Sequence, residues 1–293
     1  MYRSLSSAIA AAEREGLSLS AVALKAESEN SGRPVADIRA QLGRALKIMR
    51  EAIERGEVGD LFSASGLVGG DAAKLKKGPA GPLADTLFRD VLMRALAVQE
   101  VNAAMGVIVA APTAGGAGVL PAVLTGLAKA KQIGDEKLID ALACAGLIGA
   151  VVAERASLSG AEGGCQAETG AAAGMAAGAA VEMLGGTPKQ VGHAVALAQQ
   201  GTLGLVCDPL GGLVELPCVF RNATGAAIAL AAIEMAMSGI EFAIPADEVI
   251  DTMGEIGRDM DVRYRETAGG GLAATPTGRK LARERLVQIR RGD

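Results

Sequence analysis

Hydrophobic residues recur every three or four positions along most of the chain, and no segment alternates apolar and polar residues for long enough to indicate a β-strand. Ile38, Leu42, Ala45, Met49 and Ala52 follow this helical spacing, and charged residues occupy most of the other positions around them. The pattern predicts two or three amphipathic helices between residues 4 and 58. Further helices are predicted at 83–104, in the second half of 107–124, and at 135–155, 167–184, 188–200, 223–238 and 246–260. We therefore expect an all-α fold.

Segments rich in glycine and proline separate these predicted helices. Residues 61–82 concentrate Gly, Ser and Pro and predict a long functional loop, in which the hydroxyls of Ser63 and Ser65 either contact a substrate or cap a helix. The turn at 112–118 can present backbone N–H groups to a carboxylate, although a purely structural turn explains its glycines nearly as well. No phosphate-binding GxxxxGK[ST] motif accompanies it.

The composition indicates how such a fold is packed. Hydrophobic residues make up 50% of the 293 residues but aromatic residues only 2%, so Ala, Leu, Val, Ile and Met must fill the core. Gly170, Gly174 and Gly178 lie four residues apart on one predicted helix, where they would let a neighbouring backbone approach closely. No linker divides the chain, so we expect one continuous catalytic domain over residues 61–293 with a helical segment, residues 1–60, packed on it.

Charge and hydropathy exclude several classes of function. A net charge of −4 and few aromatic residues argue against a nucleic-acid surface. The 28 uncharged residues between Glu100 and Lys129 are interrupted by Pro112 and Pro121, so they predict buried core and no membrane span. The N-terminus shows no apolar signal region, which makes a cytoplasmic location the default expectation.

Three cysteines offer the clearest candidate chemistry. Cys165, Cys207 and Cys218 lie in short segments marked by Gly or Pro, 42 and 11 residues apart. This spacing lacks the CxxC pairs of structural zinc sites and suits three thiolates that hold an iron-sulfur cluster with one iron free of protein ligands. Free cysteines are also commonly buried as small hydrophobic residues, and on spacing alone that interpretation has nearly equal weight.

The other reactive side chains have simpler interpretations. His193, the only histidine, lies on a helix of Ala, Val and Leu, where a hydrogen-bonded structural role is favoured over a catalytic one. Lys74, Lys76 and Lys77 suit a solvated charge run better than a Schiff base. Cys144 lies in an apolar helical stretch without a turn and is expected to pack in the core.

Five segments together resemble a known family. They are SGLVGGDAAKL (65–75), APTAGGAGVLPAVL (111–124), GGCQAETG (163–170), GLVCDPLGGLVELPCVFRN (204–222) and GGLAATPTGRK (270–280). The chain is similar in these segments to the alpha chain of the iron-sulfur L-serine dehydratases, over roughly residues 60–280. The two cysteine blocks, CDP and PC, are the most specific part of the resemblance.

The resemblance implies a 4Fe-4S cluster held by Cys165, Cys207 and Cys218, without pyridoxal phosphate. It also implies a separate beta chain, and hence a hetero-oligomer, because the family's Ser-Ser-Ser-His-Thr-like segment is absent here. The catalytic base is expected on that beta chain, with His193 as a weaker internal candidate. The substrate-binding residues implied are Ser63, Ser65, Gly66, Gly69, Gly70, Thr113, Gly115, Gly116, Gly118, Arg221 and Asn222.

The reaction expected from this resemblance is conversion of L-serine to pyruvate and ammonia, with iron acting as a Lewis acid on the leaving hydroxyl. Two alternatives stay open. An L-cysteine desulfidase would use the same cluster and differ only in its leaving group. A non-catalytic iron-sulfur sensor would use the cysteines to report redox state, and its glycine loops would only pack.

Overall fold

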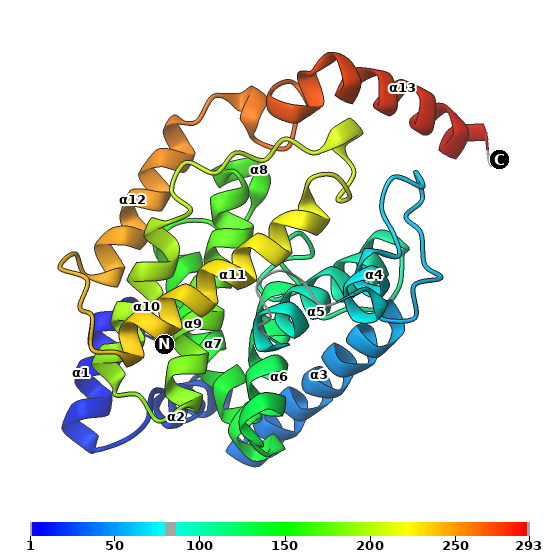
Figure 1. Cartoon of the computed structure of the whole chain (residues 1–293). Coiled ribbons are helices and arrows are strands. Elements are labelled where there is room, and N and C mark those ends of the chain that lie inside the picture. The colour runs from blue at the N-terminus through cyan, green and yellow to red at the C-terminus, as the bar shows by residue number, and fades with distance from the viewer. Residues whose placement is uncertain (1, 80–85, 292–293) are drawn as a thin grey trace.

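The computed structural model describes residues 2–79 and 86–291, with the side chains of 286–291 left out of the description. The described residues are helical throughout apart from loops and one isolated bridge between Cys207 and Arg265, which confirms the predicted all-α fold. The helices are α1 (Leu5–Glu15), α2 (Leu19–Ser31), α3 (Val35–Gly56), α4 (Asp71–Lys77), α5 (Thr86–Ala103), α6 (Val119–Lys131), α7 (Asp135–Arg155), α8 (Gly160–Gly163), α9 (Ala171–Met183), α10 (Pro188–Gln200), α11 (Cys218–Met237), α12 (Ala246–Asp259) and α13 (Pro276–Arg291) (Figure 1).

Local sequence signals explain most of the helix boundaries. Thr187 and Gln190 form the capping box expected before α10, with Pro188 at the first helical position. The side chains of Ser4 and Ser18 cap α1 and α2, and Gly16 ends α1 in the left-handed conformation. The predicted helix at 135–155 coincides with α7.

Several predictions differ from the structure: α6 (Val119–Lys131) extends beyond the predicted end at 124, and the helix predicted at 167–184 begins as a π-helical turn. The short helix α4 lies inside the segment predicted as a loop, where the backbone N–H groups of Asp71 and Ala72 donate to the Glu100 carboxylate at 2.6 and 3.2 Å. That loop prediction ends at residues 80–82, outside the described residues. Helix α11 begins at Cys218, five residues before the predicted start, so Cys218 occupies a first helical turn and not a loop.

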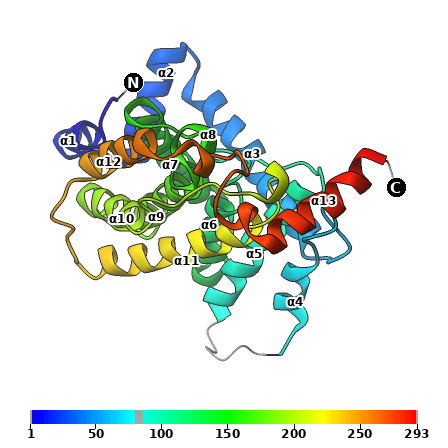
Figure 2. The ribbon, with the colours of Figure 1, turned by 90° about the horizontal axis from the view of Figure 1, so that it is seen from above.

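Helix α9 is the centre of the core. Nearly all of its residues are buried, and it packs against α6, α7, α10 and α11, as the two views of the ribbon show (Figures 1 and 2). A Cβ atom at Gly178 would lie 2.9 Å from Val195 and closer than 3 Å to Ile148, so glycine is required for this helix contact. The groups that approach Gly170, Gly174 and Gly178 are side chains, whereas the sequence predicted a neighbouring backbone.

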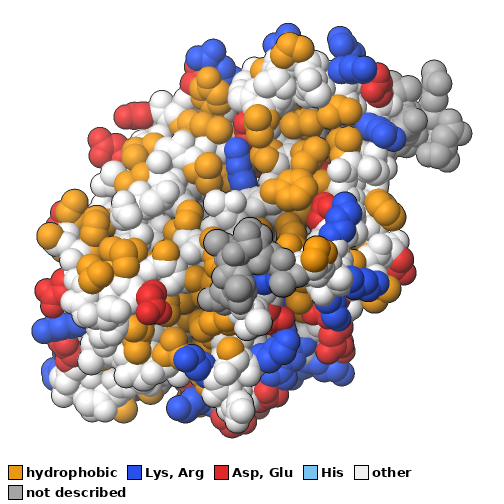
Figure 3. All heavy atoms as spheres, in the orientation of Figure 1, with side chains coloured by type: hydrophobic (Ala, Val, Ile, Leu, Met, Phe, Trp, Pro, Cys, Tyr) orange, Lys and Arg blue, Asp and Glu red, His pale blue; other side chains and the backbone are white. Residues whose placement is uncertain are grey.

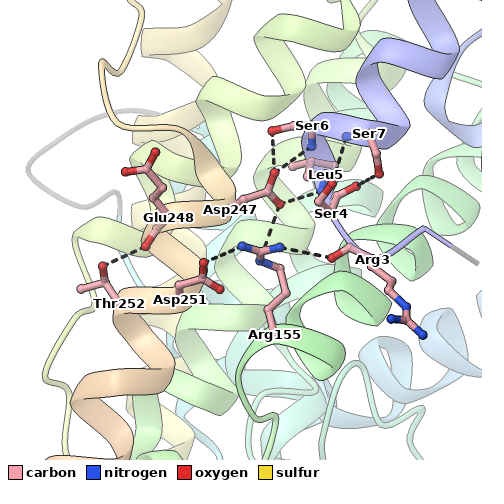
Figure 4. Close-up of polar contacts among 10 residues, drawn as sticks. All are labelled: Arg3, Ser4, Leu5, Ser6, Ser7, Arg155, Asp247, Glu248, Asp251 and Thr252. Atoms are coloured by element: carbon pink, nitrogen blue, oxygen red, sulfur yellow. Dashed lines mark hydrogen bonds and ion pairs between the residues drawn. The ribbon is translucent and has the colours of Figure 1, made fainter.

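The N-terminal helices are tied to the far end of the chain by Asp247 on α12. The Asp247 carboxylate accepts hydrogen bonds from Leu5 N at 2.7 Å and from Ser6 N at 2.9 Å (Figure 4). Arg155 at the end of α7 donates to Asp251 at 2.5 Å and to the Arg3 carbonyl at 3.4 Å. These hydrogen bonds connect the N-terminal residues 3–6 with the end of α7 and with α12.

Within the described residues, one helix, α11, is long and apolar enough to cross a membrane by length and composition alone. A core helix meets the same criteria, and α11 packs along α5, α9 and α10. The uncharged run that was predicted to be core is buried in helix α6, but the prediction is wrong for the loop before it, where Met105 and Val107 are 87% and 75% exposed.

Candidate active site

A π-helical turn, a loop and the start of α11 position Cys165, Cys207 and Cys218 respectively. Cys165 directly precedes a turn of π-helix, η1 (Gln166–Gly170), which continues into α9. Cys207 lies in the loop after α10, where its N–H donates to the Tyr264 carbonyl at 2.8 Å and its carbonyl accepts from Glu266 N at 2.8 Å. All three thiols are buried and unpaired by disulfides.

These three thiols, named here the thiol cluster, share one electrostatic environment. Burial raises the pKa of Cys218 to about 12, and the charges of Cys165 and Glu168 add to the effect. Burial raises the pKa of Cys207 still further, with contributions from Cys165, Glu168 and Cys218. Because Cys165 acts on both of the other thiols and Cys218 acts on Cys207, the structure brings together the three residues that the sequence selected.

The chemistry of the donors fits an iron-sulfur cluster. The described residues contain no group of three His, Cys, Asp or Glu side chains spaced to hold a single metal ion. A cluster of several irons is wider than one ion, so its thiolate ligands stand farther apart. The raised pKa values keep the free thiols protonated at neutral pH, and metal binding would displace those protons. The thiol cluster could therefore hold soft metal, with Cys165, Cys207 and Cys218 as ligands.

Cys144 does not belong to the thiol cluster. It is fully buried in the core on α7, and burial raises its pKa well above the ordinary value, with the Glu182 carboxylate as a further cause. The packing role predicted for this residue is confirmed.

Arg221 is a cation whose charge acts on the thiol cluster, at Cys165 and Cys218. Burial works against its charge, but the thiolates of Cys165 and Cys218 and the carboxylate of Asp208 raise its pKa. Its guanidinium forms an ion pair with Asp208 at 2.8 Å and donates to the Val206 carbonyl at 2.8 Å. Arg221 is thus held beside the sulfurs by the segment that carries Cys207.

Asn222 joins the second glycine-rich turn to the start of α11. Its amide nitrogen donates to the Gly115 carbonyl at 2.7 Å and to the Cys218 carbonyl at 2.9 Å. Its amide oxygen accepts from Gly118 N at 2.9 Å. The sequence suggested a substrate contact for Asn222. In the structure, its side chain instead makes hydrogen bonds to backbone groups of the glycine-rich turn and of Cys218.

The first glycine-rich loop is fastened to the same cysteine segment by Glu215. Ser63 Oγ donates to the Glu215 carboxylate at 2.7 Å, and both Oγ and the backbone N–H of Ser65 donate to it as well. Gly69 and Gly70 adopt positive φ angles of 146° and 76°, and Gly70 leads into α4. Glu215 lies between Cys207 and Cys218 in sequence, and the sequence analysis did not identify it.

Glu168 is a second residue that the sequence analysis missed. Its carboxylate accepts a hydrogen bond from Thr113 Oγ1 at 2.8 Å and lies 3.9 Å from Cys207 Sγ. Burial raises the pKa of Glu168, the charge of Glu266 raises it further, and the Thr113 hydrogen bond opposes both. A Cβ at Gly115 would lie 2.7 Å from this carboxylate, which explains the glycine. The only sequence signal was an acid three residues after Cys165 among small residues.

His193 lies apart from these contacts. Its Nδ1 accepts a hydrogen bond from Phe242 N at 3.2 Å, and its side chain lines a pocket between α1, α10 and the start of α12. This hydrogen bond agrees with the structural role favoured by the sequence.

A cavity of about 610 Å³ also lies away from the thiol cluster, between α3, α5 and α6. Its charged lining is largely paired: Arg50 binds Asp135, Lys76 binds Glu57, and Arg94 and Lys129 bind Asp90. The Lys76 and Lys74 ion pairs also agree with the solvated charge run expected at 74–77.

Comparison with known proteins agrees with this arrangement. A family model described as "Serine dehydratase alpha chain" matches residues 14–273, a range that includes every residue of the thiol cluster and its two glycine-rich loops. The chain belongs to the serine dehydratase alpha chain family. The resemblance seen in the five sequence segments is therefore confirmed.

The chain matches some relatives over nearly their whole length and others over only part of it. "Probable L-serine dehydratase, alpha chain" of Bacillus subtilis is 47% identical over 97% of this chain and 95% of its own length. "L-serine dehydratase, alpha chain" of Peptoniphilus asaccharolyticus is 38% identical over 93% of this chain and 94% of its own length. "L-serine dehydratase" of Streptomyces coelicolor is 43% identical over 89% of this chain but only 58% of its own length, so that relative contains a further region.

Proposed function

We propose that this chain is the alpha component of an L-serine dehydratase, that Cys165, Cys207 and Cys218 hold a 4Fe-4S cluster, and that a second chain completes the site. The family membership makes the chain part of an enzyme. The observation that carries the proposal is the convergence of three buried, unpaired thiols beside Arg221 and Glu168. No pyridoxal phosphate is required by this proposal.

The overall chemistry removes the α-proton and the β-hydroxyl of L-serine as water. The resulting enamine tautomerises and takes up water, which releases ammonia and leaves pyruvate. When bound, a cluster with one iron free of protein ligands would supply Lewis-acid chemistry to the leaving hydroxyl. The α-proton must go to a base, because the carbon-bound proton is too weakly acidic to leave to water.

The residues of this chain would prepare the site for that reaction. Asn222 fixes the turn with Gly115, Gly116 and Gly118 against α11, and its amide oxygen takes the Gly118 N–H. The N–H groups of Gly115 and Gly116 would then be held for the substrate carboxylate. Glu215 fixes Ser63 and Ser65 and hence the loop that ends with Gly66, Gly69 and Gly70. Fixed backbone donors of this kind cost no reorganisation during the reaction.

A second chain is supported by two observations. The only histidine, His193, is engaged with Phe242, so a base near the thiol cluster has no histidine source in this chain. Longer relatives such as the Streptomyces coelicolor protein contain an additional region beyond the part that this chain matches. We propose that a separate beta chain supplies that region, as a cytoplasmic hetero-oligomer.

The surface offers apolar contacts for such a partner. Large hydrophobic side chains are exposed next to the site residues in sequence, namely Phe62 before Ser63, Phe220 before Arg221, and Leu272, whose N–H donates to Asp208. Figure 3 shows hydrophobic side chains gathered below the C-terminal helix, around the start of α11. Exposed apolar patches of this kind are typical of protein interfaces.

The test is pyruvate formation from L-serine under anaerobic conditions, without added pyridoxal phosphate. We expect the chain alone to be nearly inactive and the chain with its beta partner to be active. L-cysteine is the comparison substrate, because the alternative desulfidase would release sulfide from it more efficiently than water from serine. Full activity of the isolated chain would contradict the two-chain proposal, and no activity with either substrate would favour the sensor.

A further inference from the structure

Glu168 is a partly buried carboxylate whose described contacts include no cation. Its neighbours are the Thr113 hydroxyl, the Cys207 sulfur and two glycines, Gly115 and Gly160. The one charge that is resolved as acting on it, that of Glu266, is also negative. Carboxylates removed from water are usually paired with a cation or neutralised. Glu168 thus has a place for a positive group that the described part of the chain does not fill.

We propose that Glu168 binds the α-ammonium group of the amino acid substrate, an inference that rests on the proposed function. L-serine carries one cation, its ammonium, on the carbon next to the hydroxymethyl group. A carboxylate beside the thiol cluster can therefore hold the ammonium while the substrate hydroxyl faces the cysteines. Charge-assisted hydrogen bonds of this type are the strongest that a side chain can offer a ligand.

The surroundings of Glu168 support a binding role over a packing role. Thr113 holds Oε1, and Oε2 lies toward Cys207, so the carboxylate is oriented toward the sulfurs. Side chains at Gly115 and Gly160 would collide with it, since their Cβ atoms would lie 2.7 and 2.6 Å from its oxygens. The chain leaves small residues where a buried carboxylate would otherwise be covered by apolar side chains.

The position on a π-helical turn points the same way. Residues 166–170 form one turn of π-helix before α9 begins. Such turns insert an extra residue into a helix, cost stability and occur frequently at functional sites. Here the turn places Glu168 among the glycines and Thr169 against Cys165, whose sulfur lies 3.1 Å from the Thr169 hydroxyl.

The experiment uses Glu168→Gln in the assembled two-chain enzyme. The amide has the same shape and can still accept from Thr113, but it lacks the negative charge. We expect the KM for L-serine and the inhibition constant of L-alanine to rise roughly 10-fold or more, the value for losing a hydrogen bond to a charged group. L-lactate has a hydroxyl in place of the ammonium of L-alanine and so cannot pair with the charge that is removed. Its inhibition constant should therefore change less than about threefold.

Iron and sulfide content is the readout independent of turnover, and it should be unchanged in Glu168→Gln. If turnover is lost, calorimetry with L-alanine and L-lactate measures the same two affinities directly. Glu182→Gln is the matched control, because Glu182 is also a partly buried glutamate but binds Ser20 N at 3.1 Å away from the thiol cluster. It should leave both affinities unaltered.

Three results would overturn the inference. Loss of iron would make Glu168 a metal ligand, and equal weakening of L-alanine and L-lactate would make it a support for the shape of the site. Unchanged affinity for L-serine would leave the ammonium to another group. If the wild-type pair forms no pyruvate, the proposed function fails and the inference with it, whereas an active wild type with an unaffected Glu168→Gln rejects the role of Glu168 alone.

Discussion

Helix α9 and the π-helical turn before it use small residues for opposite purposes. In α9, Gly178 receives the aliphatic side chains of Ile148 and Val195, and every atom involved is apolar. Beside the π-helical turn, Gly160 and Gly115 instead receive the carboxylate of Glu168. The first contact is satisfied within the chain, whereas the second brings a charge to a place where no cation is described.

This difference separates packing from function in a chain that is rich in glycine throughout. A glycine that admits an aliphatic group is explained by close packing of the core. A glycine that admits an unpaired carboxylate has no benefit for stability, because an unpaired buried charge destabilises the folded state. On the role proposed for Glu168, the small residues around it serve a ligand, whereas those around α9 serve the fold.

The largest expected contrast comes from Gly115→Ala and Gly178→Ala. The new Cβ at residue 115 would displace the Glu168 carboxylate, and a misplacement of about 1 Å at a site can reduce activity about 100-fold. The Cβ at residue 178 would overpack the core at a cost of about 1–3 kcal/mol in unfolding free energy. Steady-state kinetics and denaturant unfolding of both variants check the pair, and similar kinetic losses in the two would abolish the distinction.

A smaller effect is expected at Glu100, a buried carboxylate that supports the fold near the site. Burial raises its pKa, and one of its oxygens has no hydrogen-bond partner among the described residues. Between the unfolded and the raised folded pKa, the folded state binds more protons, so the unfolding free energy falls as pH rises through that window. Glu100→Gln cannot titrate, so its free energy of unfolding does not fall in this way. As pH rises, it should increase relative to that of the wild type by about 1 kcal/mol for each pH unit that separates the folded from the unfolded pKa of Glu100.

Denaturant unfolding from roughly pH 4 to 8 measures the difference in unfolding free energy between Glu100→Gln and the wild type. This range begins near the ordinary glutamate pKa and extends above it. The exposed Glu255→Gln on α12 is the control and should run parallel to the wild type. Parallel curves for Glu100→Gln would show that burial of Glu100 carries no such penalty.

Much of the fold could be predicted because helical periodicity and caps are local. The capping box at Thr187, the length of α7 and the burial of α6 all follow from neighbouring residues. The start of α11 at Cys218 and the presence of α4 were missed. The presence of α4 depends on a distant contact, since the N–H groups of Asp71 and Ala72 in its first turn donate to the Glu100 carboxylate on another helix.

The site was predictable in its sulfurs and less so in its carboxylates. The three cysteines stood out by residue type, but Glu168 and Glu215 are ordinary glutamates in sequence. Their importance comes from partners 55 and 152 residues away, Thr113 and Ser63. Likewise, Asn222 was predicted beside the site, but its three backbone hydrogen bonds could be found only in the folded chain.

The central claim is that Cys165, Cys207 and Cys218 form one metal site while Cys144 belongs to the core. Iron and acid-labile sulfide in anaerobically purified protein test it most directly. The account predicts about four of each per wild-type chain, the stoichiometry of a 4Fe-4S cluster, and the same in Cys144→Ser. It predicts loss of the intact cluster in Cys165→Ser, Cys207→Ser and Cys218→Ser. Full iron and sulfide in any of those three variants, or their loss in Cys144→Ser alone, would contradict it.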